Sequence, residues 1–134
     1  PGAVGPVLQA LHDRGIALVE DGSFQTGAFD RAAGRTQMKF ARAAATIDAK
    51  LTADDIRTEL LGLETLAKEN GASMGTGYAF PLTIEIAKDW TKDMQKRGVV
   101  LAPASALISV SAKTSQPKRV QTGSLSQAPV NPEG

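Results

Sequence analysis

Three side chains that could take part in chemistry come directly after short runs of small or apolar residues. Asp21 ends the run IALVED, Asp48 ends the run MKFARAAATID, and Tyr78 follows ASMGTG. A carboxylate at such a position can orient a substrate, bind a metal or act as a general base. A tyrosine hydroxyl can donate and accept hydrogen bonds to a ligand. We therefore take these three residues as candidate substrate-binding residues.

Each acidic candidate also has a purely structural explanation. Asp21 precedes Gly22, and an Asp-Gly pair after a strand is common turn chemistry. Asp48 could be an anchor for other residues of a site, or simply an acid in the loop before a helix that begins after Thr52. The sequence leaves these alternatives open.

The glycines around Tyr78, in the stretch MGTGYAFPLTIE, superficially resemble a phosphate-binding loop. The GxGxxG pattern would need a third glycine where Phe80 stands, and the chain has no GxxxxGK[ST] motif, so nucleotide binding is not favoured. Gly77 instead indicates a close approach of a helix or a substrate to a strand end. Pro81 suits the first turn of a following helix. We predict that Gly77 and Pro81 set the backbone of this turn.

Composition excludes several classes of site. The chain has no cysteine, which excludes thiol catalysis and Cys-ligated metals, and His12 is its only histidine, which excludes a His-rich metal site. A net charge of +1 gives no reason to expect nucleic acid as a partner. No apolar run approaches the roughly 20 residues of a membrane span, and no signal peptide is visible. We therefore predict no metal ligands and no membrane span in this chain.

The elements that must position the candidates alternate between helix and strand. Strands are predicted at 16–21, 38–48, 72–77 and 99–103, and helical segments at 4–14, 28–35, 52–70, 81–97 and 104–108. This alternation predicts an α/β fold with a parallel sheet built from βα units. The carboxyl ends of parallel strands meet at one edge, so Glu20–Asp21, Asp48, Gly77–Tyr78 and Pro103–Ser105 are expected there. Four strands are too few for a closed barrel of about eight, which leaves a small open sheet or one side of a broken barrel.

The best-specified element is the helix at 52–70. Thr52 is a good N-cap, and Glu64 and Lys68 are spaced to form an i,i+4 ion pair. Trp90, in the next helix, is predicted to lie in the core because it recurs at helical spacing with other apolar residues. The apolar face of the helix at 52–70 comprises Ile56, Leu60, Leu63 and Ala67.

The composition changes near residue 111. The segment 111–134 is rich in Ser, Gln, Pro and Gly, with few large aliphatic residues. Such a segment cannot bury enough apolar surface to offset its chain entropy. We predict one domain over residues 1–110 and a disordered polar tail over 111–134.

The joint order of these elements is the most specific feature of the sequence. From GPVLQALHDRGIALVEDGS to RGVVLAPASALI, about residues 5 to 108, it resembles the C-terminal half of the divergent polysaccharide deacetylase family. The resemblance is most specific over Gly71–Leu107. This region has a predicted strand, then a Gly-x-x-x-Pro-x-Thr turn, then a helix. The turn pattern is formed by Gly77, Pro81 and Thr83, and the helix contains Trp90.

The resemblance implies a fold, an activity and a location. The fold would be a deformed (β/α) barrel, in a periplasmic or envelope-associated bacterial protein of carbohydrate metabolism. Such enzymes hydrolyse acetyl groups on sugars with a metal-activated water, a carboxylate base and a histidine acid. A divalent metal such as zinc would belong to a complete domain, because the family's metal-binding motifs lie in an N-terminal half that we expect to be missing here. A polysaccharide or a peptidoglycan-type glycan would be the ligand.

The sequence departs from the family pattern at one candidate residue. Tyr78 stands where the family often carries the histidine of a Gly-His-Pro segment, and a phenol, which ionises near about pH 10, is a poor proton shuttle at neutral pH. Asp21 and Asp48 match acids that the family commonly shows at these strand ends. The resemblance thus predicts an incomplete, inactive portion of a deacetylase-like domain. The alternatives are a non-catalytic glycan-binding or envelope interaction module, and a stand-alone small α/β interaction domain.

Overall fold

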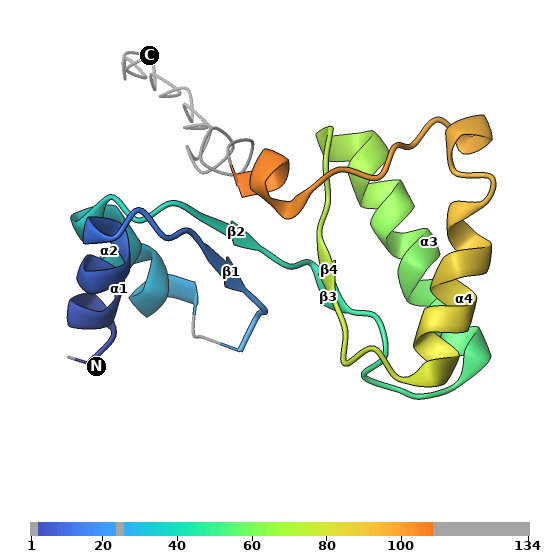
Figure 1. Ribbon diagram of the computed structural model, residues 1–134, viewed down its shortest axis with the longest axis horizontal. Helices are drawn as coiled ribbons and strands as arrows, with labels where there is room; N and C mark the ends of the chain where they lie inside the picture. Colours follow the sequence, from blue (N-terminus) through green and yellow to red (C-terminus); the bar gives the residue numbers. More distant parts are fainter. Residues whose placement is uncertain (1–2, 24–25, 109–134) are drawn as a thin grey trace, which may run out of the picture.

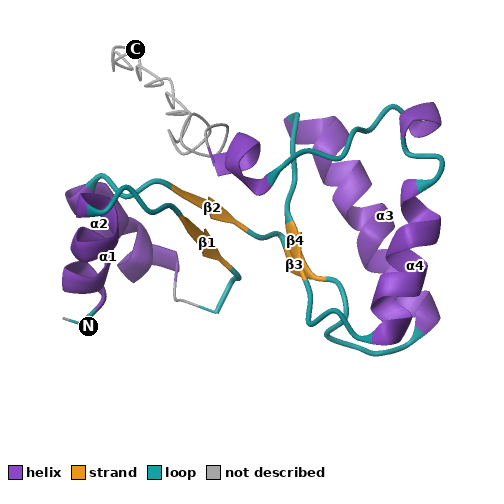
Figure 2. Ribbon diagram, in the orientation of Figure 1, coloured by secondary structure: helices purple, strands orange, loops and turns teal. Residues whose placement is uncertain are grey.

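The chain forms a mixed α/β structure in which two pairs of helices flank short parallel strands (Figures 1 and 2). The computed structural model describes residues 3–23 and 26–108, so the predicted tail at 111–134 lies outside the described residues. A helical turn at 104–108 follows the last named element. In chain order the elements are α1 (Val4–Asp13), β1 (Leu18–Glu20), α2 (Thr26–Thr36), β2 (Phe40–Arg42), β3 (Ala45–Thr46), α3 (Ala53–Asn70), β4 (Gly75–Thr76), α4 (Pro81–Thr91) and the 3-10 helix η1 (Gln95–Arg97).

The strands form two parallel pairs, each joined by a helical crossover. β1 pairs with β2 across α2, and β3 pairs with β4 across α3, as the alternation of elements predicted. The chain between β2 and β3 bonds to both sides: the Ala43 N–H donates to the Glu20 carbonyl at 2.8 Å, and the Ala44 N–H donates to the Met74 carbonyl at 2.7 Å. The single strand predicted at 38–48 is therefore wrong in detail. This segment is two short strands, which pair with β1 on one side and with β4 on the other.

The strand predicted at 99–103 is also wrong. The segment does not pair with any strand of the described residues, and Val100 and Leu101 are 75% and 69% exposed. The strand predicted at 16–21 is confined to β1, and Val19 on its outer face is 41% exposed. An apolar run indicates a buried strand, but burial also needs neighbouring strands and helices to cover both faces.

Two separate apolar cores hold these elements. One lies between α1 and α2, and a second lies between α3 and α4. Both are built mainly from aliphatic and small residues. The first comprises Leu8, Phe29, Ala32, Ala33 and Met38, and the second comprises Ile56, Leu60 and Ile86, with Trp90 packed against it.

Local signals placed both ends of α3 and the start of α4 correctly, but the single helix predicted at 81–97 is wrong, because α4 ends at Thr91 and the separate 3-10 helix η1 follows at Gln95–Arg97. The Thr52 hydroxyl accepts the Asp55 N–H at 3.2 Å, which satisfies one free donor of the first turn of α3. Gly71 ends that helix with a φ of 85°, a left-handed conformation that glycine adopts without steric cost. Pro81 lies in the first turn of α4, as predicted. The short helix predicted at 28–35 is confirmed and longer, because α2 runs from Thr26 to Thr36.

Gly75 is the tightest position in the second strand pair, and its replacement by alanine is expected to destabilise the fold. A Cβ atom there would lie 2.5 Å from Leu63 Cδ1 and 3.2 Å from Ile47 Cγ2. Gly75→Ala should therefore lower the free energy of unfolding by about 1 to 3 kcal/mol, measured by urea denaturation. The matched control is Gly62→Ala on α3, where a Cβ atom would meet nothing within 4 Å. This control should raise the free energy of unfolding by about 0.5 to 1 kcal/mol. Equal effects at the two positions would contradict the close packing of Gly75 against Leu63 and Ile47.

Candidate functional site

The structure brings Asp48 and Tyr78 together at the carboxyl ends of β3 and β4. Thr46 and Thr76 are paired in register, so each candidate lies two residues beyond the paired end of its strand. The Tyr78 N–H donates to both carboxylate oxygens of Asp48, at 3.0 Å to Oδ1 and 2.9 Å to Oδ2. The Thr83 hydroxyl, in the first turn of α4, donates to Oδ2 at 2.9 Å. One carboxylate thus ties the end of β3 to the loop that joins β4 and α4.

The surroundings of Asp48 favour its ionised form. Its side chain is buried, with the residue 2% exposed, and burial by itself raises the pKa. Hydrogen bonds from the Tyr78 N–H and the Thr83 hydroxyl outweigh this effect, so the pKa of Asp48 lies below its usual value. A buried carboxylate with both oxygens engaged is arranged as an anchor of the turn, one of the explanations that the sequence left open for Asp48.

Tyr78 is directed outward from the same turn. It is 73% exposed, and Phe80, two residues later, is 41% exposed. The two rings lie 6.0 Å apart between centroids and are tilted by 47°. Gly77 allows this turn to lie close to β3, because a Cβ atom there would be 3.2 Å from Asp48 Oδ1. The result is an exposed aromatic pair above a buried carboxylate.

Asp21 lies at the end of the other strand pair, β1–β2. It is exposed and accepts the Ser23 N–H at 3.0 Å, and hydrogen bonds from the Ser23 side chain and then from this N–H lower the pKa of Asp21. The buried carboxylate at this strand end is its neighbour Glu20, which was expected at this strand end together with Asp21 but whose burial was not predicted. Glu20 is 1% exposed and bonds to Arg42 Nε at 2.6 Å, and Arg42 also bonds to Asp30 at 2.7 Å. The available signal was the alternation along IALVED, which puts Glu20 on the same face as Leu18.

Glu64 was also misjudged from the sequence. It was predicted to pair with Lys68 along α3, but it points inward and is 4% exposed. Arg97 donates to it from Nε at 2.9 Å and from Nη2 at 2.7 Å, and Trp90 Nε1 donates to Oε1. The hydrogen bonds from Arg97, and to a smaller extent the bond from Trp90, keep the pKa of Glu64 below its usual value, although burial by itself raises it. This network joins α3, α4 and η1 and stabilises their packing against one another.

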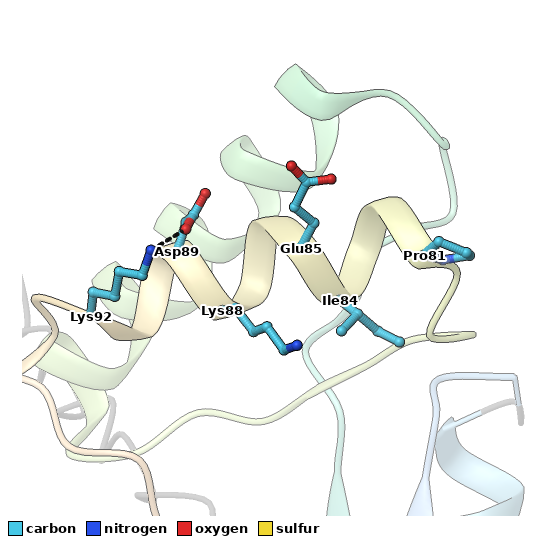
Figure 3. A pocket seen from close by; sticks show the side chains of 6 residues that line it. All are labelled: Pro81, Ile84, Glu85, Lys88, Asp89 and Lys92. Atoms are coloured by element: carbon cyan, nitrogen blue, oxygen red, sulfur yellow. Dashed lines mark hydrogen bonds and ion pairs between the residues drawn. The ribbon is translucent and has the colours of Figure 1, made fainter.

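A shallow depression lies along α4 (Figure 3). Its lining residues belong to α4 and to Lys92, which directly follows it, and all are exposed, so no second element closes over a ligand there. An ion pair of 2.7 Å between Lys92 and Asp89 crosses its far end. We assign no site to this depression, whose lining residues are Pro81, Ile84, Glu85, Lys88, Asp89 and Lys92.

Comparison with known proteins identifies the family. The sequence model described as divergent polysaccharide deacetylase matches residues 1–108, which include every element of the fold. The chain belongs to the divergent polysaccharide deacetylase family. No curated protein matches it significantly.

One solved structure resembles this deacetylase-family chain closely. It is the crystal structure of the uncharacterized protein ATU2773 from Agrobacterium tumefaciens C58, with a TM-score of 0.74 and 28% sequence identity. The match covers 78% of this chain and 43% of that protein, so the chain spans less than half the length of the relative. The comparison supports the mixed α/β fold with short parallel strands.

The deacetylase family implies a divalent metal, but the described residues of this family member do not fit one. Within residues 3–23 and 26–108, no three Asp, Glu or His side chains gather in an arrangement that could hold an ion. Both Asp48 oxygens already accept hydrogen bonds, and Asp21 belongs to the other strand pair. We therefore derive no metal-dependent step from this part of the chain. Over the same residues, no helix combines the length and the apolar character that a bilayer crossing requires.

The lowered pKa of buried Asp48 predicts that the stability of this deacetylase-family chain falls in acid. A folded-state pKa below the unfolded value contributes stability that is present above the unfolded pKa and lost as the pH falls through the folded pKa. The urea midpoint should therefore be flat from pH 7 to 5 and fall below about pH 4. Asp48→Asn should make this fall shallower and leave the part that Glu64 contributes, whereas Asp89→Asn, at an exposed ion pair, should leave the fall unchanged. Parallel curves for wild type and Asp48→Asn would contradict the assignment.

Proposed function

We propose that this chain binds glycan through the Tyr78 turn and forms one part of a deacetylase-like (β/α) barrel. The observation that carries the proposal is the exposed pair of Tyr78 and Phe80 at the carboxyl ends of β3 and β4. A pyranose ring offers a C–H face that packs on an aromatic ring, and its hydroxyl groups can bond to a tyrosine hydroxyl. Ligands of parallel α/β folds gather at this end of the strands.

The class of ligand follows from the family. Membership of the divergent polysaccharide deacetylases supports an acetylated polysaccharide or a peptidoglycan-type glycan, at a location in the bacterial envelope. The barrel is supported by the parallel βαβ units and by the likeness to a solved chain more than twice the matched length. In a complete domain, the remaining strands would supply the other walls of the cleft.

We further propose that this chain alone does not release acetate. Tyr78 stands where the family often carries a histidine, and the described residues gather no set of metal ligands. Added Zn²⁺ should therefore give no acetate from an N-acetylated chitooligosaccharide above a protein-free control. Acetate release that depends on this protein would contradict the proposal of inactivity, and it would leave glycan binding intact.

An NMR titration tests the binding proposal on the full chain. Addition of an N-acetylated chitooligosaccharide to ¹⁵N-labelled protein should shift the amides of residues 76–83 most strongly. The amides of α1, on the first core, should shift little and serve as the internal control. Saturating additions that leave the amides of residues 76–83 unchanged would refute glycan binding at this turn.

A further inference from the structure

Ala79 has a backbone conformation that its own sequence does not favour. Its φ is +57°, and among the described residues only Gln37 shares a positive φ without being glycine. Such a conformation is sterically unfavourable for a residue with a Cβ atom. Gln37 directly follows α2, where left-handed residues commonly end helices. Ala79 lies before a helix, where no such explanation applies, so other contacts must hold it.

The contacts that hold Ala79 converge on Asp48. The carboxylate accepts the Tyr78 N–H on one side of the strained residue and the Thr83 hydroxyl on the other. Thr83 is 3% exposed and Asp48 is 2% exposed, so the bond between their side chains is shielded from water. The missing side chain at Gly77 leaves the space that the carboxylate occupies, since a Cβ atom there would lie 3.2 and 3.3 Å from its two oxygens.

We propose that Asp48 is a positioning residue that holds the strained turn at Ala79 and thereby fixes the direction of the Tyr78 ring. Without the carboxylate, Ala79 would relax to a negative φ, because the bonds from Tyr78 and Thr83 that span it would be lost. Tyr78 and Phe80 would then lose their fixed relation, and ordering them would weaken ligand binding. The effect on ligand affinity rests on the proposed glycan-binding function, whereas the positioning of the ring does not.

A fluorine label reports this positioning directly. Tyr78 is the only tyrosine, so protein labelled with 3-fluorotyrosine has one ¹⁹F resonance, and it comes from the turn. Wild type should give a single sharp signal. Asp48→Asn should broaden, split or displace it, because the amide nitrogen cannot accept the Tyr78 N–H. Affinity for an N-acetylated chitooligosaccharide should fall at least about tenfold, and Asp89→Asn on α4 should change neither readout.

A glycine at position 79 distinguishes a positioning role of Asp48 from a general effect of Asp48 on stability. Ala79→Gly removes the steric cost of the positive φ, so Asp48→Asn/Ala79→Gly should recover the wild-type ¹⁹F signal and most of the lost affinity. A changed ¹⁹F signal in a folded Asp48→Asn protein that Ala79→Gly does not restore would overturn the positioning role. So would an unchanged ¹⁹F signal in a folded Asp48→Asn protein, with folding judged from the fluorescence of Trp90.

Two further outcomes remain distinguishable. If Asp48→Asn does not fold, Thr83→Val removes one bond to the carboxylate and should displace the ¹⁹F signal in the same direction by a smaller amount. An unchanged signal in folded Thr83→Val would then overturn the proposal. If the signals move and recover as expected but no variant binds the oligosaccharide, the positioning role stands and the proposed glycan function fails.

Discussion

Replacement of Phe29 by alanine is expected to lower the free energy of unfolding by about 3 to 5 kcal/mol. Phe29 is 1% exposed in the first core, and its ring meets the Phe40 ring edge-on, with 4.9 Å between centroids. The neighbours on its own helix, Ala32 and Ala33, are too small to fill the cavity that the substitution would leave. For a small domain, whose total stability is about 5 to 15 kcal/mol, such a loss is large.

Urea denaturation followed by circular dichroism measures this loss. The control is Val7→Ala on α1, a residue 58% exposed, which should change the free energy of unfolding by less than about 0.5 kcal/mol. A Phe29→Ala protein as stable as this control would show that the core between α1 and α2 does not hold the fold together.

Replacement of Glu64 by glutamine is expected to cost about 2 kcal/mol of stability. The substitution keeps the size of the side chain but removes the charge that receives two bonds from the Arg97 guanidinium. The Trp90 indole loses its ionised acceptor as well, and as the only tryptophan it reports the change through its emission. We expect a lower urea midpoint together with a displaced emission maximum.

Glu59→Gln is the matched control on the same helix. Glu59 is exposed on α3, so its neutral replacement should change stability by less than about 0.5 kcal/mol. Equal midpoints for Glu64→Gln and Glu59→Gln would mean that the network among α3, α4 and η1 contributes no stability.

The parts of the fold that the sequence predicted are those fixed by local rules. The cap at Thr52, the left-handed Gly71 and the first-turn Pro81 each act within a few residues of their own position. The meeting of Asp48 and Tyr78 also followed from sequence, because the carboxyl ends of parallel strands lie at one edge. Local patterns therefore gave the helices, the parallel order and the location of the turn.

The missed features depend on contacts between distant residues. Glu64 and Arg97 lie 33 residues apart, and Glu20 and Arg42 lie 22 apart, so no local pattern pairs them. The position of Glu64, four residues after buried Leu60, places it on the apolar face and could have indicated an inward side chain. The segment at 99–103 has the composition of a buried strand, but pairing needs a neighbour, and the described residues provide none.

The most direct test of glycan binding at the Tyr78 turn compares dissociation constants for an N-acetylated chitooligosaccharide. Wild type should bind, and Tyr78→Ala should bind at least about tenfold more weakly, because the exposed ring provides the packing surface. Ile84→Ala, on the depression along α4, should bind within about twofold of wild type. Equal affinities for wild type and Tyr78→Ala, or a loss confined to Ile84→Ala, would contradict glycan binding at this turn.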